Sequence, residues 1–466
     1  MAASAPIQKT IYLGTFVHSK SLTELDIYEH AAIGVDENGI ISFIEKGIAN
    51  VQDIKSQKPE WKNAKTIIPK YKNSFFFPGF IDTHTHAPQH PNTGLFGKTT
   101  LLDWLQTYTF PMEASFTDLD RARKIYSNFV SRTLSHGTTT AAYYATIHVP
   151  ATNLLADICL KRGQRALVGR VCMDSDLSPS YYRDASVESS VADSSACISY
   201  IRSIDPAGEI VRPILTPRFA PSCTSECLRA IADVARETAS FVQTHISENV
   251  GEIALVKEMF PQSTSYTDVY DTHGLLTPKT ILAHAVHLSE EERRTIRSRG
   301  STISHCPASN TAITSGLCPV RELLDEGHTL GLGTDVSGGF SPSILENVRQ
   351  AIWVSRHLSL QTSQESDKLA TEEALYLATR GGAKVVGLED KVGGFEVGME
   401  WDAQMVVLGE VQEGEVVEGQ VDVFGWEKTG DKVEKWVYSG DDRNTVAVWV
   451  RGRLVHTTSR YGGADV

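Results

Sequence analysis

The sequence predicts an α/β protein, a (β/α)8, TIM-like barrel with a small β domain built from both chain termini. Eight short apolar segments alternate with helical segments between about residues 75 and 390. Helical pattern is scarce at the two ends, where strand-like segments prevail. Each end has too few strands to bury a core alone, so we expect the two ends to share one small domain.

The eight predicted barrel strands are short and rich in apolar residues. An open, doubly wound sheet is the alternative, but it usually has fewer strands and a glycine-rich phosphate loop after the first one, and this sequence shows no such loop. The predicted strands are Phe75–Ile81, Thr138–Tyr144, Ala166–Cys172, Ile210–Leu215, Phe241–Thr244, Thr280–Ala283, Thr302–Ser304 and Thr329–Leu332.

Helical segments separate these strands, and two of them carry clear boundary signals. One is expected to begin at Thr117, an N-cap with Asp120 three residues on, and to stop at Gly137. Another is expected from Ser343 through Val354, with apolar residues spaced for one face at Ile344, Leu345, Val348 and Ile352.

The terminal strands supply the predicted small domain. Glu37-Asn38-Gly39 is a hairpin turn signal between two of them. We therefore expect residues 1–77 and 393–466 to form the small domain and 78–392 the catalytic barrel, with an acidic, exposed insertion at about 409–434. The strands expected there are Ile11–Val17, Ala31–Val35, Ile40–Ile44, Ala403–Leu408, Lys435–Tyr438 and Val446–Leu454.

Composition limits the partners. Hydrophobic residues make up 41% of the 466 residues and charged residues 22%, as in ordinary globular proteins. A formal net charge of −13 argues against nucleic acid and against anionic membranes. We expect neither a membrane span nor a secretory signal. The seven cysteines are scattered, with no Cys-x-x-Cys pair, which predicts reduced thiols and a cytoplasmic location.

Residues that can bind a metal follow several predicted strands. His84 and His86 close the first strand, and residues two apart on a strand point to the same side. His245, His284 and Asp335 follow the fifth, sixth and eighth strands. Active sites of this fold lie at the carboxyl ends of the strands. The sequence therefore predicts a metal site with nitrogen and oxygen ligands, suited to zinc or iron.

Such a site would activate water. A metal with an open position lowers the pKa of bound water to about 7. Glu248, three residues past His245, can then move a proton between that water and a substrate. The alternative is a solvated glutamate in the first turn of a helix. The fourth strand contains no lysine that could bridge two metals, so we expect one ion.

Several stretches resemble the amidohydrolase superfamily, and within it the family whose members deaminate guanine. The resemblance covers nearly the whole chain except about 409–434. Two of these stretches indicate the family that deaminates guanine within the superfamily, namely Thr216–Phe219 and the stretch from Trp104 to Pro111. The similar stretches are Pro78–Gln89, Leu101–Leu105, Tyr108–Pro111, Thr216–Phe219, Ser304–Asn310, Gly331–Gly339 and Gly440–Asn444.

The resemblance implies hydrolytic deamination of guanine to xanthine and ammonia, as in purine catabolism or salvage, by metal-bound hydroxide that attacks the amino-bearing ring carbon. It implies a homodimer and one zinc ion (Zn2+) per chain, held by His84, His86, His245 and Asp335. Glu248 would be the proton shuttle, His284 would orient the hydroxide, and Asp335 would assist. The residues implied to contact the purine are His86, Gln89, Arg218, Phe219, His245, Glu248 and Asp335.

These contacts make physical sense for a purine. Phe219 can lie on a ring face, Arg218 can donate to the ring carbonyl, and the Gln89 amide can pair with ring nitrogens. A surface ion pair is the alternative role for Arg218. Two alternative functions remain open: another deaminase or hydrolase of the superfamily, acting on cytosine, another purine or a triazine, or a catalytically inactive barrel that serves as a scaffold.

Overall fold

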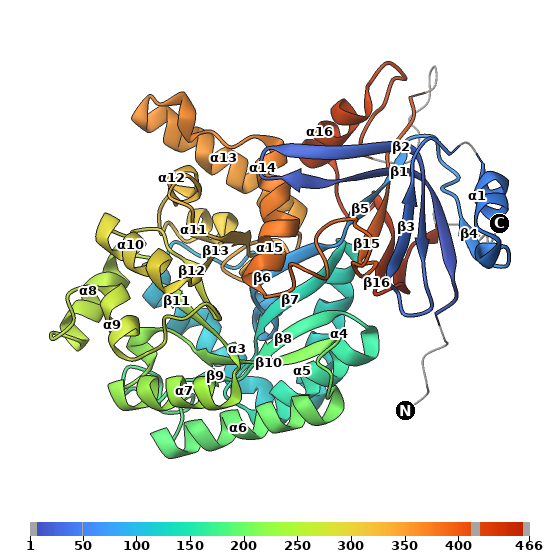
Figure 1. Ribbon diagram of the computed structural model, residues 1–466. Helices are drawn as coiled ribbons and strands as arrows, with labels where there is room; N and C mark the ends of the chain where they lie inside the picture. The colour runs from blue at the N-terminus through green and yellow to red at the C-terminus, as the bar shows by residue number, and fades with distance from the viewer. Residues whose placement is uncertain (1–6, 49, 412–419, 460–466) are drawn as a thin grey trace.

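The computed structural model describes residues 7–48, 50–411 and 420–459. Eight parallel strands follow one another around a barrel in chain order, which confirms the predicted fold (Figure 1). A short strand, β9 (Val171–Cys172), pairs with β10 beside this ring. The eight strands are β6 (Phe80–His86), β7 (Thr138–Tyr144), β8 (Arg165–Gly169), β10 (Val211–Pro217), β11 (Phe241–Ile246), β12 (Thr280–His284), β13 (Thr302–His305) and β14 (Leu330–Leu332).

The last strand meets the first through bonds at their carboxyl ends. The Asp335 amide donates to the His84 carbonyl at 2.8 Å. The buried carboxylate of Asp82 accepts from the Thr334 amide at 3.0 Å and from the Thr334 hydroxyl at 2.5 Å. These bonds hold the loop after β14 against β6, so that Asp335 and the two histidines of β6 share one end of the barrel.

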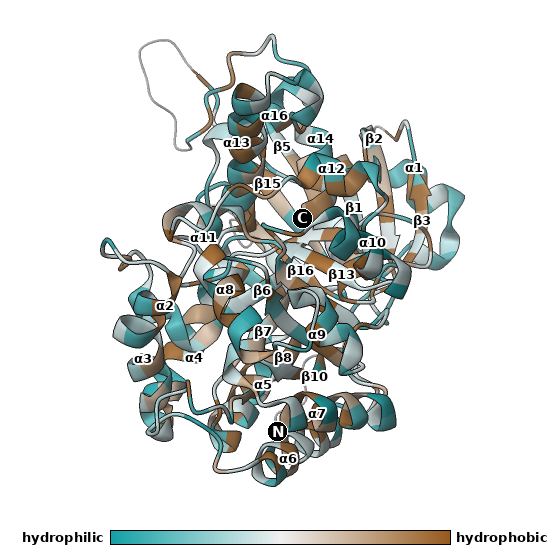
Figure 2. Ribbon diagram, turned by 90° about the vertical axis from the view of Figure 1, so that its left-hand side faces the viewer, coloured by the Kyte–Doolittle hydropathy of each residue, from teal (hydrophilic) through white to brown (hydrophobic). Residues whose placement is uncertain are grey.

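Helices cover the outside of the barrel. Helix α10 is largely hydrophilic, as Figure 2 shows, and its buried residues are Glu292 and Ile296. The helices after the barrel strands are α2 (Leu101–Trp104), α3 (Phe110–Ala114), α4 (Leu119–Ser135), α5 (Val149–Arg162), α6 (Val187–Ile204), α7 (Ser225–Thr238), α8 (Val250–Met259), α9 (Tyr266–Thr272), α10 (Glu290–Arg299), α11 (Pro307–Ala312), α12 (Val320–Asp325), α13 (Ile344–Thr362), α14 (Thr371–Tyr376) and α15 (Gly382–Val385).

The two predicted helix starts have different outcomes. The prediction of Thr117 as an N-cap is wrong by one residue, because the Asp118 side chain accepts the first free amides of α4, at 3.0 and 3.1 Å. Ser343 is the N-cap of α13, as expected, and accepts from the Glu346 amide at 3.2 Å. That helix continues past Val354 to Thr362.

The small sheet contains strands from both ends of the chain, which confirms the predicted arrangement. Figure 1 shows the blue N-terminal strands beside the red C-terminal strands. Strand β5 joins them, since it pairs with both β1 and β15. The strands are β1 (Thr10–Ser21), β2 (Glu24–Val35), β3 (Ile41–Glu45), β4 (Lys65–Ile67), β5 (Ser74–Pro78), β15 (Ala403–Val407), β16 (Thr445–Val450) and β17 (Arg453–Thr457).

The prediction of Phe75–Ile81 as one barrel strand is wrong. Residues up to Pro78 belong to β5 of the small sheet, and the barrel begins with β6 at Phe80. The chain changes sheets at Gly79, whose Cα lies so close to Thr139 that an added Cβ would be 2.2 Å from that side chain. An apolar run alone does not reveal that its two halves belong to different sheets.

The C-terminal segment differs from the prediction in three ways. Val446–Leu454, expected as one strand, contains the turn between the antiparallel strands β16 and β17. Lys435–Tyr438, expected as a strand, lies in α16 (Thr429–Ser439), whose residue Trp436 is buried against Phe75 and Phe77. The expected insertion at about 409–434 is only partly exposed, because Val421 and Val423 are buried. Residues 412–419 of it lie outside the described residues.

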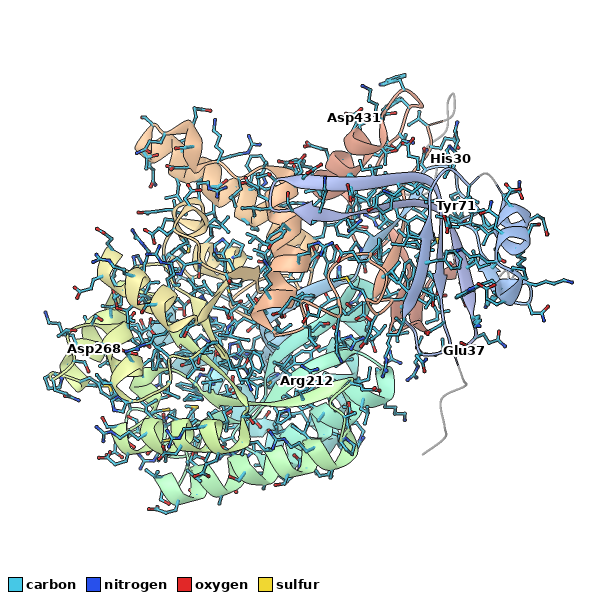
Figure 3. The ribbon with its side chains drawn as sticks, viewed as in Figure 1. His30, Glu37, Tyr71, Arg212, Asp268 and Asp431 are labelled. Atoms are coloured by element: carbon cyan, nitrogen blue, oxygen red, sulfur yellow. The ribbon has the colours of Figure 1, made fainter. Side chains whose placement is uncertain are left out.

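The predicted hairpin turn in the N-terminal part is present. Glu37, labelled in Figure 3, lies in the turn between β2 and β3, where the Gly39 amide donates to the Asp36 carbonyl at 3.0 Å. Helix α1 (Val51–Gln57) follows β3. Within the described ranges, no helix combines the length and the apolar character that crossing a bilayer requires.

Candidate active site

Four predicted metal ligands meet at one end of the barrel. The Asp335 Oδ1 atom lies 3.1 Å from His84 Nε2 and 3.3 Å from His86 Nε2. The Nε2 atoms of His86 and His245 are 3.3 Å apart. Residues separated by some 250 positions in the chain therefore direct their ligand atoms at a common point, as the strand-end pattern predicts.

The protonation states suit a cation there. Burial lowers the pKa of His84, His86 and His245, that of His86 to about 4, so the imidazoles are neutral. Burial raises the pKa of Asp335, but the histidines outweigh it and lower that pKa well below its usual value. Neutral imidazole and ionised carboxylate are the forms that bind metals.

The separations also fit one ion. With metal–nitrogen bonds of about 2.0–2.1 Å, ligand atoms of a tetrahedral site stand about 3.3 Å apart. The Nε2 atoms of His86 and His245, 3.3 Å apart, can share either a proton, as an N–H···N hydrogen bond, or a metal ion. The residues present therefore fit a single divalent ion.

Contacts behind the ligands fix their orientation. The His245 Nδ1–H donates to the Arg218 carbonyl at 2.5 Å, which leaves Nε2 free for a metal. The ring of Tyr144, from the end of β7, packs on the imidazoles of His84 and His86 with centroids 4.7 and 4.5 Å away. The sequence analysis did not single out Tyr144.

Several site residues adopt left-handed backbone conformations. His284 has φ of 74° and Asp335 has φ of 46°, and Ser247, next to Glu248, has φ of 47°. Such conformations are unfavourable for residues other than glycine and concentrate at functional sites. The strain turns these side chains from the strand ends toward the pocket.

Glu248 and His284 face each other beside the ligands. The Glu248 Oε2 atom lies 3.4 Å from His284 Nε2, and its Oε1 accepts from the Ser315 hydroxyl at 3.1 Å. The His284 Nδ1 atom lies 2.8 Å from Asn310 Oδ1 and donates to it. Burial, with the nearby Asp335 carboxylate, raises the pKa of Glu248 well above its usual value. Its protonated form is therefore favoured more than that of an ordinary glutamate.

The alternative role of Glu248 as a solvated helix-start residue does not match its position, because it is 2% exposed and precedes α8 in the loop after β11. The set of residues whose ligand atoms lie within 4.8 Å of one another consists of His84, His245, His284 and Asp335, and it does not include His86. His284 Nε2, 3.7 Å from Asp335 Oδ2, is therefore a further possible ligand.

A pocket opens at this site. It brings together all the predicted substrate contacts. Leu101, Trp104, Leu105 and Ile313 add apolar walls that the sequence analysis did not assign to the site. The predicted residues that line it are His86, Gln89, Arg218, Phe219, His245, Glu248, His284 and Asp335.

Arg218 is not a surface residue. It follows β10, and its side chain is 2% exposed. Arg212, labelled in Figure 3, lies at the opposite end of that strand. The Arg218 guanidinium bonds to both carboxylate oxygens of Glu113, at 2.7 and 3.1 Å. The sequence analysis missed Glu113, although it comes two residues after the stretch that ends at Pro111.

A second group of residues that could bind a metal makes hydrogen bonds within the protein instead. Asp174, Cys223 and Cys227 lie together outside the pocket. The Asp174 carboxylate accepts from the Thr224 amide at 2.8 Å and from its hydroxyl at 2.6 Å, next to the start of α7. The Cys223 thiol donates to the Cys172 carbonyl at 3.3 Å. These hydrogen bonds explain why the three residues lie close together at the start of α7.

Known proteins resemble this chain over nearly its whole length. The family model described as "Amidohydrolase family" matches residues 75–455. A probable guanine deaminase of Schizosaccharomyces pombe is 48% identical over 446 residues, covering 96% of this chain and 83% of the relative. The human guanine deaminase is 39% identical and covers 97% of this chain and 98% of its own length.

A solved structure shares both the fold and part of the sequence. The guanine deaminase from C. acetobutylicum, crystallised with guanine in its active site, superimposes with a TM-score of 0.86. It is 32% identical, and the match covers 96% of this chain and 100% of the other. The agreement includes the barrel and the small sheet.

Proposed function

Because this chain belongs to the amidohydrolase family, we propose that it hydrolyses guanine to xanthine and ammonia. The observation that carries the proposal is that one pocket joins the convergent histidine and aspartate ligands to the buried Arg218. Relatives that are guanine deaminases over their full length support the choice of substrate.

The metal is proposed to be one zinc ion per chain. His84, His86, His245 and Asp335 would hold it, since Asp335 Oδ1 lies 3.1 Å from His84 Nε2 and 3.3 Å from His86 Nε2, and His245 Nε2 lies 3.3 Å from His86 Nε2. When bound, a divalent ion would supply Lewis-acid activation of water at neutral pH. Nitrogen and oxygen ligands are also compatible with iron, so the metal itself needs to be measured.

The protein groups would move the protons. His284 and Asp335 orient the attacking water toward the ring carbon that bears the amino group. Glu248 delivers a proton to the adjacent ring nitrogen, takes up a proton that the attacking water loses, and passes it to the departing amino group, which leaves as ammonia. The second proton of the water replaces the one that Glu248 first gave. Its raised pKa suits a group that both gives and receives protons.

The remaining residues of the pocket would recognise the purine. Arg218 and Gln89 would bond to the carbonyl and nitrogen atoms of the purine, with the Phe219 ring against its face. The Phe219 ring lies 6.4 Å from the His245 ring, so a ligand on Phe219 lies beside the candidate metal ligands.

A cytoplasmic location and a homodimer complete the proposal. All seven cysteines are free thiols, which suits a reducing compartment. The homodimer rests on the resemblance to the family, and sedimentation of the purified protein tests it.

The function is tested by incubating the zinc-loaded protein with guanine and following xanthine and ammonia. Adenine, cytosine and a chlorotriazine serve as controls. We expect ammonia from guanine at a rate far above that from the controls. Preferred turnover of a control would identify a different deaminase or hydrolase of the family, and absence of turnover on all four would favour the inactive scaffold.

A further inference from the structure

A buried carboxylate that the proposed reaction does not use bonds to two residues that line the pocket, Gln89 and Arg218. Glu113 lies on α3 and is completely buried. It accepts hydrogen bonds from Arg218 Nη1 and Nη2, from Gln89 Nε2 at 2.8 Å, and from the Tyr182 hydroxyl at 2.7 Å. Two of these three partners are the residues proposed to recognise the purine.

Helix α3 holds Arg218 in two ways. Phe110 and Glu113 are three residues apart, so they lie on the same face of the helix. The guanidinium carbon of Arg218 lies 5.2 Å from the centre of the Phe110 ring, within the range of a cation–π contact. A ring and a carboxylate on one short helix therefore fix both the plane and the direction of the guanidinium.

The orientation of Gln89 is fixed at both ends of its amide. Its Nε2 donates to Glu113, while its Oε1 accepts from the Ser337 amide at 3.2 Å. Reversing the amide would place its oxygen against the Glu113 carboxylate, which is unfavourable. The second N–H of Nε2 remains available to a ligand, so Gln89 presents a donor.

The charge state of Glu113 agrees with this arrangement. Burial raises its pKa, but the guanidinium of Arg218 and its hydrogen bonds outweigh burial and lower the pKa below the usual value. As an ionised group, Glu113 only accepts hydrogen bonds. Arg218, Gln89 and Tyr182 must therefore each direct a donor at Glu113. The other N–H groups of Arg218 and Gln89 remain available to a ligand in the pocket.

We propose that Glu113 is a positioning residue that makes this part of the pocket present N–H donors only, and so selects a purine that bears a carbonyl rather than an amino group at the position read by Arg218 and Gln89. The inference rests on the proposed function. It assigns the selectivity for an oxopurine to a residue that need not touch the substrate.

The main test compares guanine with 2,6-diaminopurine, which carries an amino group where guanine carries its carbonyl. In Glu113→Gln, the amide can donate as well as accept, so the directions of Arg218 and Gln89 are no longer enforced. We expect kcat/KM for guanine to fall by about 10²-fold, as for a misplaced binding group, mainly through KM. The value for 2,6-diaminopurine should change much less, so the selectivity ratio falls.

The matched control is Asp402→Asn. Asp402 is also a buried carboxylate, and it is bound to Arg165 at 2.7 and 3.0 Å. Arg165 lies at the start of β8, away from the pocket. We expect that control to keep the wild-type selectivity ratio and KM. A purely structural role of Glu113 would lower turnover of both purines equally.

A milder pair covers the case in which Glu113→Gln does not fold. Tyr182→Phe removes one hydrogen bond to Glu113, and Tyr143→Phe removes a buried bond of equal length, 2.7 Å, to Gln164. We expect the KM for guanine to rise about threefold to tenfold in Tyr182→Phe and to stay unchanged in Tyr143→Phe.

The outcomes separate this inference from the proposed function. If the wild-type protein forms no xanthine from guanine, both are refuted. If it does, but the selectivity ratio and KM stay at wild-type values in Tyr182→Phe and in any folded Glu113→Gln, the positioning role alone is refuted.

Discussion

Arg165 and Arg218 lie at opposite ends of the barrel, and each is buried against carboxylates. Both side chains are 2% exposed. Arg165, at the start of β8, bonds to Asp402 and Glu400 near the small sheet. Arg218, which lines the pocket after the end of β10, bonds to Glu113. The same pairing of charges therefore occurs at the stability end and at the active-site end of the fold.

The two arginines differ in how many donors they have left. Arg165 gives Nε, Nη1 and Nη2 to Asp402, Glu400 and a backbone carbonyl. Arg218 gives one bond from each terminal nitrogen to Glu113, and within the described part of the chain no oxygen or nitrogen accepts from its Nε. A buried arginine with an unused nitrogen beside a cavity indicates ligand recognition, whereas one that donates from all three nitrogens indicates structure.

The largest expected effect lies at the active-site end. Glu248→Gln removes the proton carrier but keeps the shape of the side chain. We expect turnover of guanine to fall by about 10²–10⁴-fold, the usual contribution of general acid–base catalysis. Bound metal, guanine affinity and melting temperature should stay near wild type, as measured by elemental analysis, calorimetry and thermal denaturation. Turnover close to wild type would exclude Glu248 as the shuttle.

The next effect lies at the opposite end. Asp402→Asn leaves the buried Arg165 with reduced charge compensation, and breaking such a pair costs about 3–5 kcal/mol of stability. Denaturant titration should show this loss, while the KM for guanine per folded molecule stays unchanged. A change in KM would mean that the two ends of the barrel are coupled and would break the comparison.

A conservative change at Arg218 should have the opposite effect, because it should change the KM for guanine rather than the stability of the fold. Arg218→Lys keeps the positive charge beside Glu113 but loses the planar fork that bonds to both its oxygens. We expect kcat/KM for guanine to fall by about 10-fold to 100-fold, mostly through KM, since two directed hydrogen bonds are lost. Steady-state kinetics and a thermal melt measure both quantities, and an unchanged KM would remove Arg218 from substrate recognition.

The smallest effect concerns a helix far from either arginine. Asp118→Ala removes the N-cap of α4, and such changes cost about 1 kcal/mol. Kinetics with guanine should remain unaffected, and denaturant titration should show the small loss. A loss of catalytic activity would instead indicate that α4 holds the pocket.

The strand-end positions were the part of the site that the sequence could predict. Parallel strands of a barrel all end on one side, so His84, His86, His245, His284 and Asp335 could be brought together from order alone. Their local backbone, with positive φ at His284 and Asp335, could not, because no glycine marks those positions.

Other features depend on contacts between distant segments. Glu113 follows a π-turn (Leu105–Thr109) on a helix of five residues, where a glutamate is usually solvated. Its role becomes visible only when Arg218, about a hundred residues later, packs against it. Similarly, the apolar pattern around Trp436 is compatible with a strand or with a helix. The structure forms the helix, in which Trp436 packs against Phe75 and Phe77.

The central claim is that four side chains from the ends of three barrel strands bind one divalent ion. Crystals of zinc-loaded protein, measured at the zinc absorption edge, test it directly. The account predicts a single anomalous peak per chain between the Nε2 atoms of His84, His86 and His245 and the carboxylate of Asp335. No peak there in a protein that deaminates guanine, or a peak elsewhere, would contradict it.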